Sequence, residues 1–136
     1  MKNMVNKIEH IGIAVKDLEK SNQLFSALLG VDAYKTEEVF SESVTVSFFK
    51  TGDSKIELLQ ATNENSPIAK FINKKGEGIH HLAFEVDDIL KTMTELKNLG
   101  FELLSETPKQ GADNKLICFL HPKNTNGVLI ELCQEK

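Results

Sequence analysis

Bulky apolar residues occupy every second position in His10-Ile-Gly-Ile-Ala-Val15, and the same alternation returns over residues 79–86. This period of two is typical of half-buried strands and predicts strands over residues 7–15 and 79–86. After each strand, apolar residues recur at a spacing close to that of a helix. These residues are Leu18, Phe25 and Leu28 in the first half of the chain, and Ile89, Met93 and Leu96 in the second.

Residues typical of helix ends flank both helical segments. Asp17 and Asp88 stand directly before them, where a carboxylate can accept a hydrogen bond from a free amide of the first turn. Gly30 and Gly100 follow them, where glycine readily takes the left-handed conformation that ends a helix. Each half of the chain therefore begins with a strand and a capped helix.

The remainder of each half is predicted to be mostly strand. The β-type segments are residues 31–39, 43–50 and 54–60 in the first half, and 101–107, 115–120 and 127–133 in the second. Asn126-Gly127 predicts a hairpin turn before the last strand. Between the two halves, Ser66-Pro67 predicts the start of a short helix that ends at Gly76.

The two halves are copies of one module. His10-Ile-Gly-Ile-Ala-Val matches His81-Leu-Ala-Phe-Glu-Val at an offset of 71 residues (81 − 10). Ile56-Glu57-Leu58 matches Ile130-Glu131-Leu132 at an offset of 74 (130 − 56), a drift that a small loop insertion produces. The order βαβββ, twice, predicts an α+β fold.

The module boundaries predict one domain over residues 7–135. The modules cover about residues 7–60 and 78–135, with a helical connector over 61–77. A module of about 55 residues buries too little apolar surface to be stable alone, so we expect the two to form a single core.

Composition and charge narrow the function. The 136 residues carry a formal net charge of −4, all 16 basic residues are Lys, and there is no Arg, which argues against a nucleic-acid partner and excludes a site built on guanidinium groups. No apolar run approaches the roughly 18 residues of a membrane span, and the first residues lack the apolar core of an export signal. Cys118 and Cys133 are too few for a disulfide framework, so we expect a cytoplasmic protein.

Two histidines and two glutamates repeat at equivalent places in the modules, namely His10 with His81 and Glu57 with Glu131. Each lies in a strand otherwise filled with apolar residues. Alternation puts His10 on a small, open face with Gly12 and Ala14, as the floor of a cleft requires. Two imidazoles and two carboxylates suit a divalent metal such as Co, Mn, Ni, Fe or Zn, whereas one such residue alone is usually only a partly exposed side chain.

Specific motifs extend over about residues 7–134. They are His10-Ile-Gly-Ile-Ala-Val, Ile56-Glu57-Leu-Leu, Ser66-Pro67-Ile-Ala-Lys-Phe71, Gly76-Glu-Gly-Ile-His-His81-Leu-Ala-Phe, Phe119-Leu-His-Pro-Lys123 and Asn126-Gly-Val-Leu-Ile-Glu131-Leu. In these motifs the chain resembles the vicinal oxygen chelate (glyoxalase/bleomycin-resistance) superfamily and, within it, most closely the methylmalonyl-CoA epimerase family.

The resemblance implies a fold, a reaction and a ligand set. The fold is a curved, incomplete mixed β-barrel around a metal cleft, and the metal ligands are His10, Glu57, His81 and Glu131. The reaction is the interconversion of (2R)- and (2S)-methylmalonyl-CoA through abstraction of the α-proton, with one divalent ion (Co, Mn, Ni, Zn or Mg) as cofactor. Glu131 is our first candidate for the catalytic base, and we expect an acyl-CoA substrate and a homodimer.

Some features depart from the family pattern and leave alternatives open. The position at which some epimerases carry a second glutamate base is Val46 here, so that base is unassigned, and the loop Val39–Val44 is atypical. A glyoxalase I-like lactoylglutathione lyase is the first alternative, although the absence of Arg argues mildly against a glutathione substrate. The second is a metal-free module of this fold that binds small molecules, but such modules usually lack the four ligands.

An anionic CoA substrate needs basic partners in this acidic chain. Two groups of lysines are available, Lys109, Lys115 and Lys123 in the second module and Lys70, Lys74 and Lys75 in the connector helix. Most surface lysines are only solvated, so the sequence assigns none of the six to the substrate. His80 is expected to be structural, His121 either to line the cleft or to belong to a turn, and Cys133 to be a small buried apolar residue.

Overall fold

The computed structural model describes residues 3–136, which divide into two compact units. One unit comprises His10–His80, so the connector belongs to the first module. The other comprises His81–Lys136 together with the N-terminal segment that ends at Glu9. A single domain over residues 7–135 stays a prediction. No helix among the described residues is long and apolar enough to cross a membrane.

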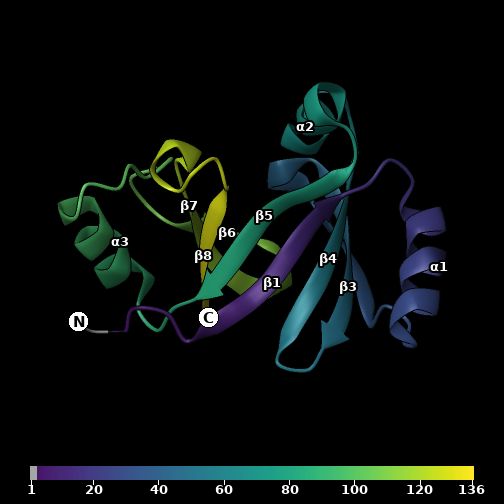
Figure 1. The fold of residues 1–136 in the computed structure, drawn as a ribbon, viewed down its shortest axis with the longest axis horizontal. Helices are drawn as coiled ribbons and strands as arrows, with labels where there is room; N and C mark the ends of the chain where they lie inside the picture. The colour runs from purple at the N-terminus through teal and green to yellow at the C-terminus, as the bar shows by residue number, and fades with distance from the viewer. Residues whose placement is uncertain (1–2) are drawn as a thin grey trace. The chain divides into compact units, whose positions relative to one another are not determined.

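The first unit carries one mixed sheet and two helices (Figure 1). In chain order the elements are β1 (Lys7–Ala14, in this unit from His10 onward), α1 (Leu18–Leu29), β2 (Lys35–Val39), a 3₁₀ turn (Phe40–Glu42), β3 (Val44–Thr51), β4 (Ser54–Ala61) and α2 (Pro67–Lys75). The strand order is β2-β3-β4-β1. β1 runs parallel to β4, while the other neighbours are antiparallel.

The second unit repeats this arrangement with a shorter edge strand. Its elements are β5 (Gly78–Glu85, in this unit from His81 onward), α3 (Ile89–Asn98), β6 (Lys109–Gln110), a turn over Ala112–Asn114, β7 (Lys115–Leu120), a 3₁₀ turn (Pro122–Asn124) and β8 (Ile130–Glu135). The strand order is β5-β8-β7-β6, with β5 parallel to β8 and the others antiparallel. Both units therefore have the βαβββ order that the repeat predicts.

The strand predicted over residues 101–107 is wrong. In that segment only Leu103 forms an isolated bridge, to Leu120, and the edge strand β6 comes later and has two residues. The physical reason is local, because Pro108 has no amide to donate and the polar residues before it form bends instead of a ladder.

The strands predicted over residues 31–39 and 127–133 begin later than expected. β2 starts at Lys35 instead of residue 31, and β8 starts at Ile130 instead of residue 127. Asn126 and Gly127 do take left-handed conformations, with φ of 56° and 84°. They belong to a longer turn, however, in which the Gly127 amide donates to the Pro122 carbonyl at 2.8 Å, so the two-residue hairpin is wrong.

The predicted helix caps are confirmed. Asp17 accepts from the Lys20 amide at 3.1 Å and Asp88 from the Lys91 amide at 3.1 Å. Gly30 ends α1 with φ of 72°. In α3 the cap is Leu99, and Gly100 follows it with φ of 100°.

Two glutamines that the sequence analysis missed hold the same helix starts. Gln60 of β4 accepts from the Leu18 amide at 2.5 Å, and Gln134 of β8 accepts from the Ile89 amide at 2.7 Å. Each glutamine lies three residues after a repeated glutamate, so it extends toward the helix while the glutamate occupies the opposite face of the strand. The offset of 74 residues (134 − 60) was the signal that could have found them.

Replacing Gln60 by Leu is expected to lower the free energy of unfolding by about 1–3 kcal/mol, because the Leu18 amide then loses its acceptor. Urea unfolding followed by circular dichroism measures the change. Gln23→Leu, at an exposed position of α1, is the matched control and should shift the midpoint little. Equal shifts for the two variants would contradict a role for the glutamine.

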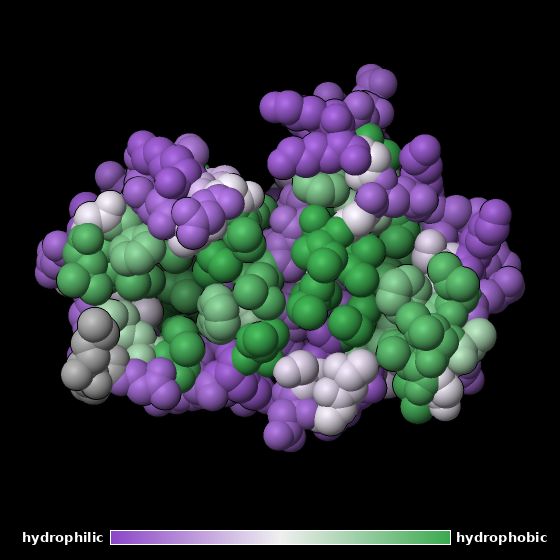
Figure 2. All heavy atoms as spheres, viewed as in Figure 1, coloured by the Kyte–Doolittle hydropathy of each residue, from purple (hydrophilic) through white to green (hydrophobic). Residues whose placement is uncertain are grey.

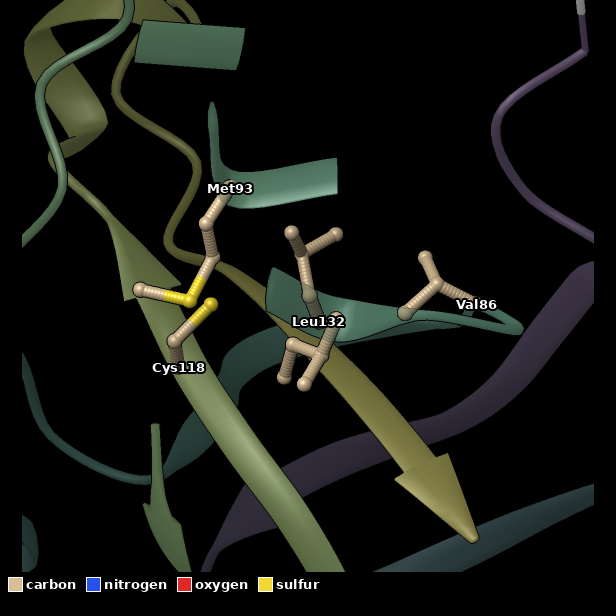
Figure 3. Close-up of a cluster of buried hydrophobic side chains, with 5 residues drawn as sticks. Val86, Met93, Cys118 and Leu132 are labelled. Atoms are coloured by element: carbon tan, nitrogen blue, oxygen red, sulfur yellow. The ribbon is translucent and has the colours of Figure 1, made fainter. Parts of the chain in front are cut away.

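Each helix covers one face of its own sheet, as the strand alternation predicts. In the first unit, Ile13 and Val15 pack with Leu18 and Phe25 of α1 around Phe49, which is fully buried. In the second unit, Val86, Met93, Cys118 and Leu132 form the equivalent cluster, in which Met93 and Cys118 point toward each other (Figure 3).

The N-terminal segment is part of the second unit's structure. Val5 packs against the cluster around Val86. The Asn6 amide donates to the Glu85 carbonyl at 2.9 Å, and the Asn6 side chain donates to Asp87 at 2.8 Å. These contacts attach the beginning of the chain to the second half of the repeat.

Candidate metal-binding site

The two parallel strand pairs hold a histidine and a glutamate in the same register. In the first unit Gly12 of β1 lies opposite Glu57 of β4, and His10 precedes Gly12 by two residues. In the second unit Ala83 of β5 lies opposite Glu131 of β8, and His81 precedes Ala83 by two residues. Residues two apart on a strand share a face, so each histidine and its glutamate extend from the same side of the sheet.

Each histidine contacts its glutamate directly. His10 Nδ1 lies 3.2 Å from Glu57 Oε2, and His81 Nε2 lies 3.2 Å from Glu131 Oε1. All four residues are buried, with 4–6% of each exposed. The structure therefore brings His10 to Glu57 in one unit and His81 to Glu131 in the other.

The donor atoms fit a divalent cation. Two ligands bound to one ion at about 2.0–2.2 Å lie about 3.0–3.4 Å apart, which matches the 3.2 Å separation of nitrogen and oxygen in both pairs. Burying a carboxylate beside an imidazole is otherwise costly unless the histidine is protonated. Nitrogen and carboxylate donors suit transition metals of intermediate softness.

An aromatic residue lies beside each pair. Phe48 lies opposite Glu57 in the ladder and is fully buried, and the Phe119 ring meets the His81 ring edge-on with centroids 5.9 Å apart. Ala14, two residues beyond Gly12 on the His10 face, is also fully buried. The prediction that the His10 face is open is wrong, because His10 and Ala14 are both buried.

Val46 lies on the same face of the first sheet as Glu57. Phe48 lies opposite Glu57 in the ladder, and Val46 is two residues from Phe48 on the same strand. Only 1% of Val46 is exposed. Val46 is aliphatic and cannot accept a proton. The side chains of the two pairs that can do so as carboxylates are Glu57 and Glu131.

Both cysteines are buried. Burial raises the pKa of Cys118 to about 12, and the nearby Glu131 carboxylate adds to the rise. Cys133 is fully buried and donates from Sγ to the Phe84 carbonyl at 3.5 Å. The prediction that Cys133 is a small buried residue is confirmed.

The other two histidines have structural contacts. His80 meets the Phe71 ring of α2 edge-on, with centroids 5.0 Å apart. His121 Nδ1 accepts from the Lys123 amide at 3.0 Å and so closes the 3₁₀ turn that follows β7. Beside this turn, Lys123 donates to Glu102 and thereby lowers the pKa of that exposed carboxyl.

A family model described as the glyoxalase/bleomycin resistance protein/dioxygenase superfamily matches residues 9–119. The chain belongs to this superfamily. The predicted recognition and the α+β fold class are thereby confirmed.

Relatives within the superfamily are similar over nearly the whole chain. An ethylmalonyl-CoA/methylmalonyl-CoA epimerase of Cereibacter sphaeroides is 42% identical over 96% of this chain and 99% of its own length. The crystal structure of methylmalonyl-CoA epimerase from Mycobacterium tuberculosis is 33% identical, has a TM-score of 0.95, and is matched over 100% of this chain and 92% of its own.

A third relative was solved with its substrate. This methylmalonyl-CoA epimerase, in complex with methylmalonyl-CoA and an ammonium ion, is 34% identical with a TM-score of 0.91, over 96% of this chain and 95% of its own. The superfamily member described here is therefore similar in sequence and fold to enzymes that act on an acyl-CoA.

Proposed function

We propose that this superfamily member is a metal-dependent epimerase that interconverts (2R)- and (2S)-methylmalonyl-CoA. The observation that carries the proposal is the buried His–Glu pair that both units repeat, with the same register and the same 3.2 Å separation. The similarity to methylmalonyl-CoA epimerases over nearly the full chain supports the substrate.

The metal ligands in this proposal are His10, Glu57, His81 and Glu131, all holding one divalent ion. The equivalence of the two pairs supports a shared site, because each copy of the repeat then contributes one histidine and one glutamate to a set of four ligands. Co, Mn, Ni, Zn and Mg all accept such donors, with imidazole favouring the transition metals. When bound, a divalent cation stabilises the negative charge that develops on the thioester oxygen.

The reaction requires the protein to move a proton from the carbon between the thioester and the carboxylate. Glu131 accepts this proton in the proposal, through the carboxylate oxygen that does not face His81. The His81 contact at 3.2 Å and the apolar surroundings hold the Glu131 carboxylate in one orientation. Delivery of a proton to the opposite face of the carbon, by a second acid that the sequence leaves unassigned, completes the epimerisation.

The test is to incubate the protein, loaded in turn with each divalent metal, with (2R)-methylmalonyl-CoA in deuterated water. Deuterium should enter the α-position with inversion, as NMR and chiral analysis of the product would record. The hemithioacetal of glutathione and methylglyoxal is the parallel substrate. Formation of lactoylglutathione without α-exchange in methylmalonyl-CoA would replace the proposal by the lyase alternative, and no turnover of either substrate would support a binding module.

A homodimer in the cytoplasm completes the proposal. Leu24 and Leu28 of α1 are 64% and 71% exposed, and apolar surface of this kind is often covered by another subunit. Both cysteines are free, which suits a reducing compartment. Light scattering coupled to size-exclusion chromatography should give twice the mass of one chain.

A further inference from the structure

The structure shows which of the six lysines considered as partners for an anionic substrate already contact a carboxylate. Lys115 is 6% exposed and contacts Glu135 at 3.0 Å, and Lys123 contacts Glu102 at 2.6 Å. Lys109 lies over the Phe119 ring, with Nζ 5.9 Å from its centroid. The charges of Lys115 and Lys123 are therefore already matched by carboxylates of their own unit.

The three lysines of α2 differ in this respect. Lys70, Lys74 and Lys75 are exposed, and none of them has a carboxylate within ion-pair distance among residues 3–136. Pro67–Lys75 contains no acidic residue, so α2 carries three positive charges in a chain whose net charge is −4. Within residues 3–136, the only aromatic contact of this group is Lys75 over the Phe71 ring at 5.8 Å. The surface over α2 is correspondingly hydrophilic (Figure 2).

Glu77, the acid that follows α2, makes no ion pair with these lysines. The Glu77 carboxylate accepts from the Lys16 amide at 2.7 Å. This hydrogen bond also places the end of α2 beside the residues that follow β1, while α2 itself packs against β4. Because β1 and β4 are parallel, α2 lies where the carboxyl ends of both strands meet (Figure 1).

The distance from the His10–Glu57 pair to this edge suits an acyl-CoA. His10 precedes the end of β1 at Ala14 by four residues, and Glu57 precedes the end of β4 at Ala61 by four. Four residues of strand span about 13 Å. The pantetheine arm between thioester and pyrophosphate has the length of about four extended residues, or roughly 15 Å. An acyl-CoA that extends from the pair toward the carboxyl ends of β1 and β4 therefore reaches the end of the sheet that carries α2 with its phosphates.

We infer that Lys70, Lys74 and Lys75 bind the phosphates of the nucleotide part of the acyl-CoA substrate. The inference rests on the proposed function for its substrate and adds the residues that recognise the part of the substrate remote from the chemistry. Binding energy from that remote part lowers KM, whereas removal of the α-proton takes place at the other end of the molecule.

The test compares two substrates in a triple variant, Lys70→Gln, Lys74→Gln and Lys75→Gln. KM for methylmalonyl-CoA should rise about 10- to 100-fold with kcat little changed, since each exposed ion pair contributes up to a factor of about five. KM for methylmalonyl-pantetheine, which lacks the nucleotide, should stay within about twofold. The matched control is Lys20→Gln, Lys91→Gln and Lys97→Gln, which removes three exposed lysines from α1 and α3.

A direct binding measurement separates this inference from the proposed function. Adenosine 3′,5′-bisphosphate carries phosphates of the nucleotide without a thioester, and calorimetry should detect its binding to the wild type and to the control, weakening with added salt. The α2 variant should bind it at least tenfold more weakly at equal thermal stability. Equal affinity in all three proteins, or an equal rise of KM for both substrates, overturns the inference. A wild type that is inactive but binds the probe through α2 contradicts only the proposed epimerase activity.

Discussion

Replacing Glu131 by Gln is expected to lower the epimerisation rate by about 10²–10⁴-fold, the loss typical of a missing general base. The amide oxygen of Gln can still coordinate a cation, but it cannot accept the α-proton at neutral pH. Much of the metal affinity should therefore remain. The substitution keeps the size of a side chain that is 5% exposed, so packing around β8 should change little.

Two measurements on the Glu131→Gln variant distinguish chemistry from assembly. Metal content after gel filtration should stay near that of the wild type, while deuterium exchange at the α-carbon falls with turnover. Exchange that survives from one epimer alone would show that another group acts on the second face, with Glu57 as the next carboxylate to replace. Glu106→Gln, an exposed loop position, is the control. Full metallation with turnover near wild type would make Glu131 a ligand only.

The repeat made much of the site predictable. Because His10 and His81 begin matching strands, and Glu57 and Glu131 lie in matching later strands, the sequence predicted two equivalent pairs before any distance was known. The structure confirms the contact within each pair. Strand alternation also predicted which face of β1 packs under α1, since only one face carries bulky residues.

Other features depend on contacts that local patterns do not encode. Alternation reports that the side chains on the His10 face are small, but it does not report that they are buried. The hydrogen bonds of Gln60 and Gln134 join a strand to a distant helix start, and a single glutamine is ordinarily a surface residue. The sequence did not distinguish the paired lysines from those of α2, because the carboxylate partners of Lys115 and Lys123 lie 20 and 21 positions away in the chain.

Replacing His10 by Ala is expected to remove metal and activity together, because a nitrogen ligand is lost from the proposed set. Metal affinity should fall by more than the roughly 10–100-fold typical of losing a group that only orients a ligand. A wild type that binds its metal gains about 2.7 kcal/mol of stability at a metal concentration of one hundred times Kd, and the variant should lose this gain. Excess metal should partly restore both stability and turnover.

The metal stoichiometry of His10→Ala and His81→Ala decides whether the two pairs serve one ion. If all four residues hold a single cation, the wild type binds one per chain, and either substitution reduces tight binding to nearly none. If each pair binds its own cation, the wild type binds two and each variant keeps one, which contradicts the shared site. His121→Ala is the control, because His121 accepts from the Lys123 amide in a turn. It should lose about 1 kcal/mol of stability and no metal.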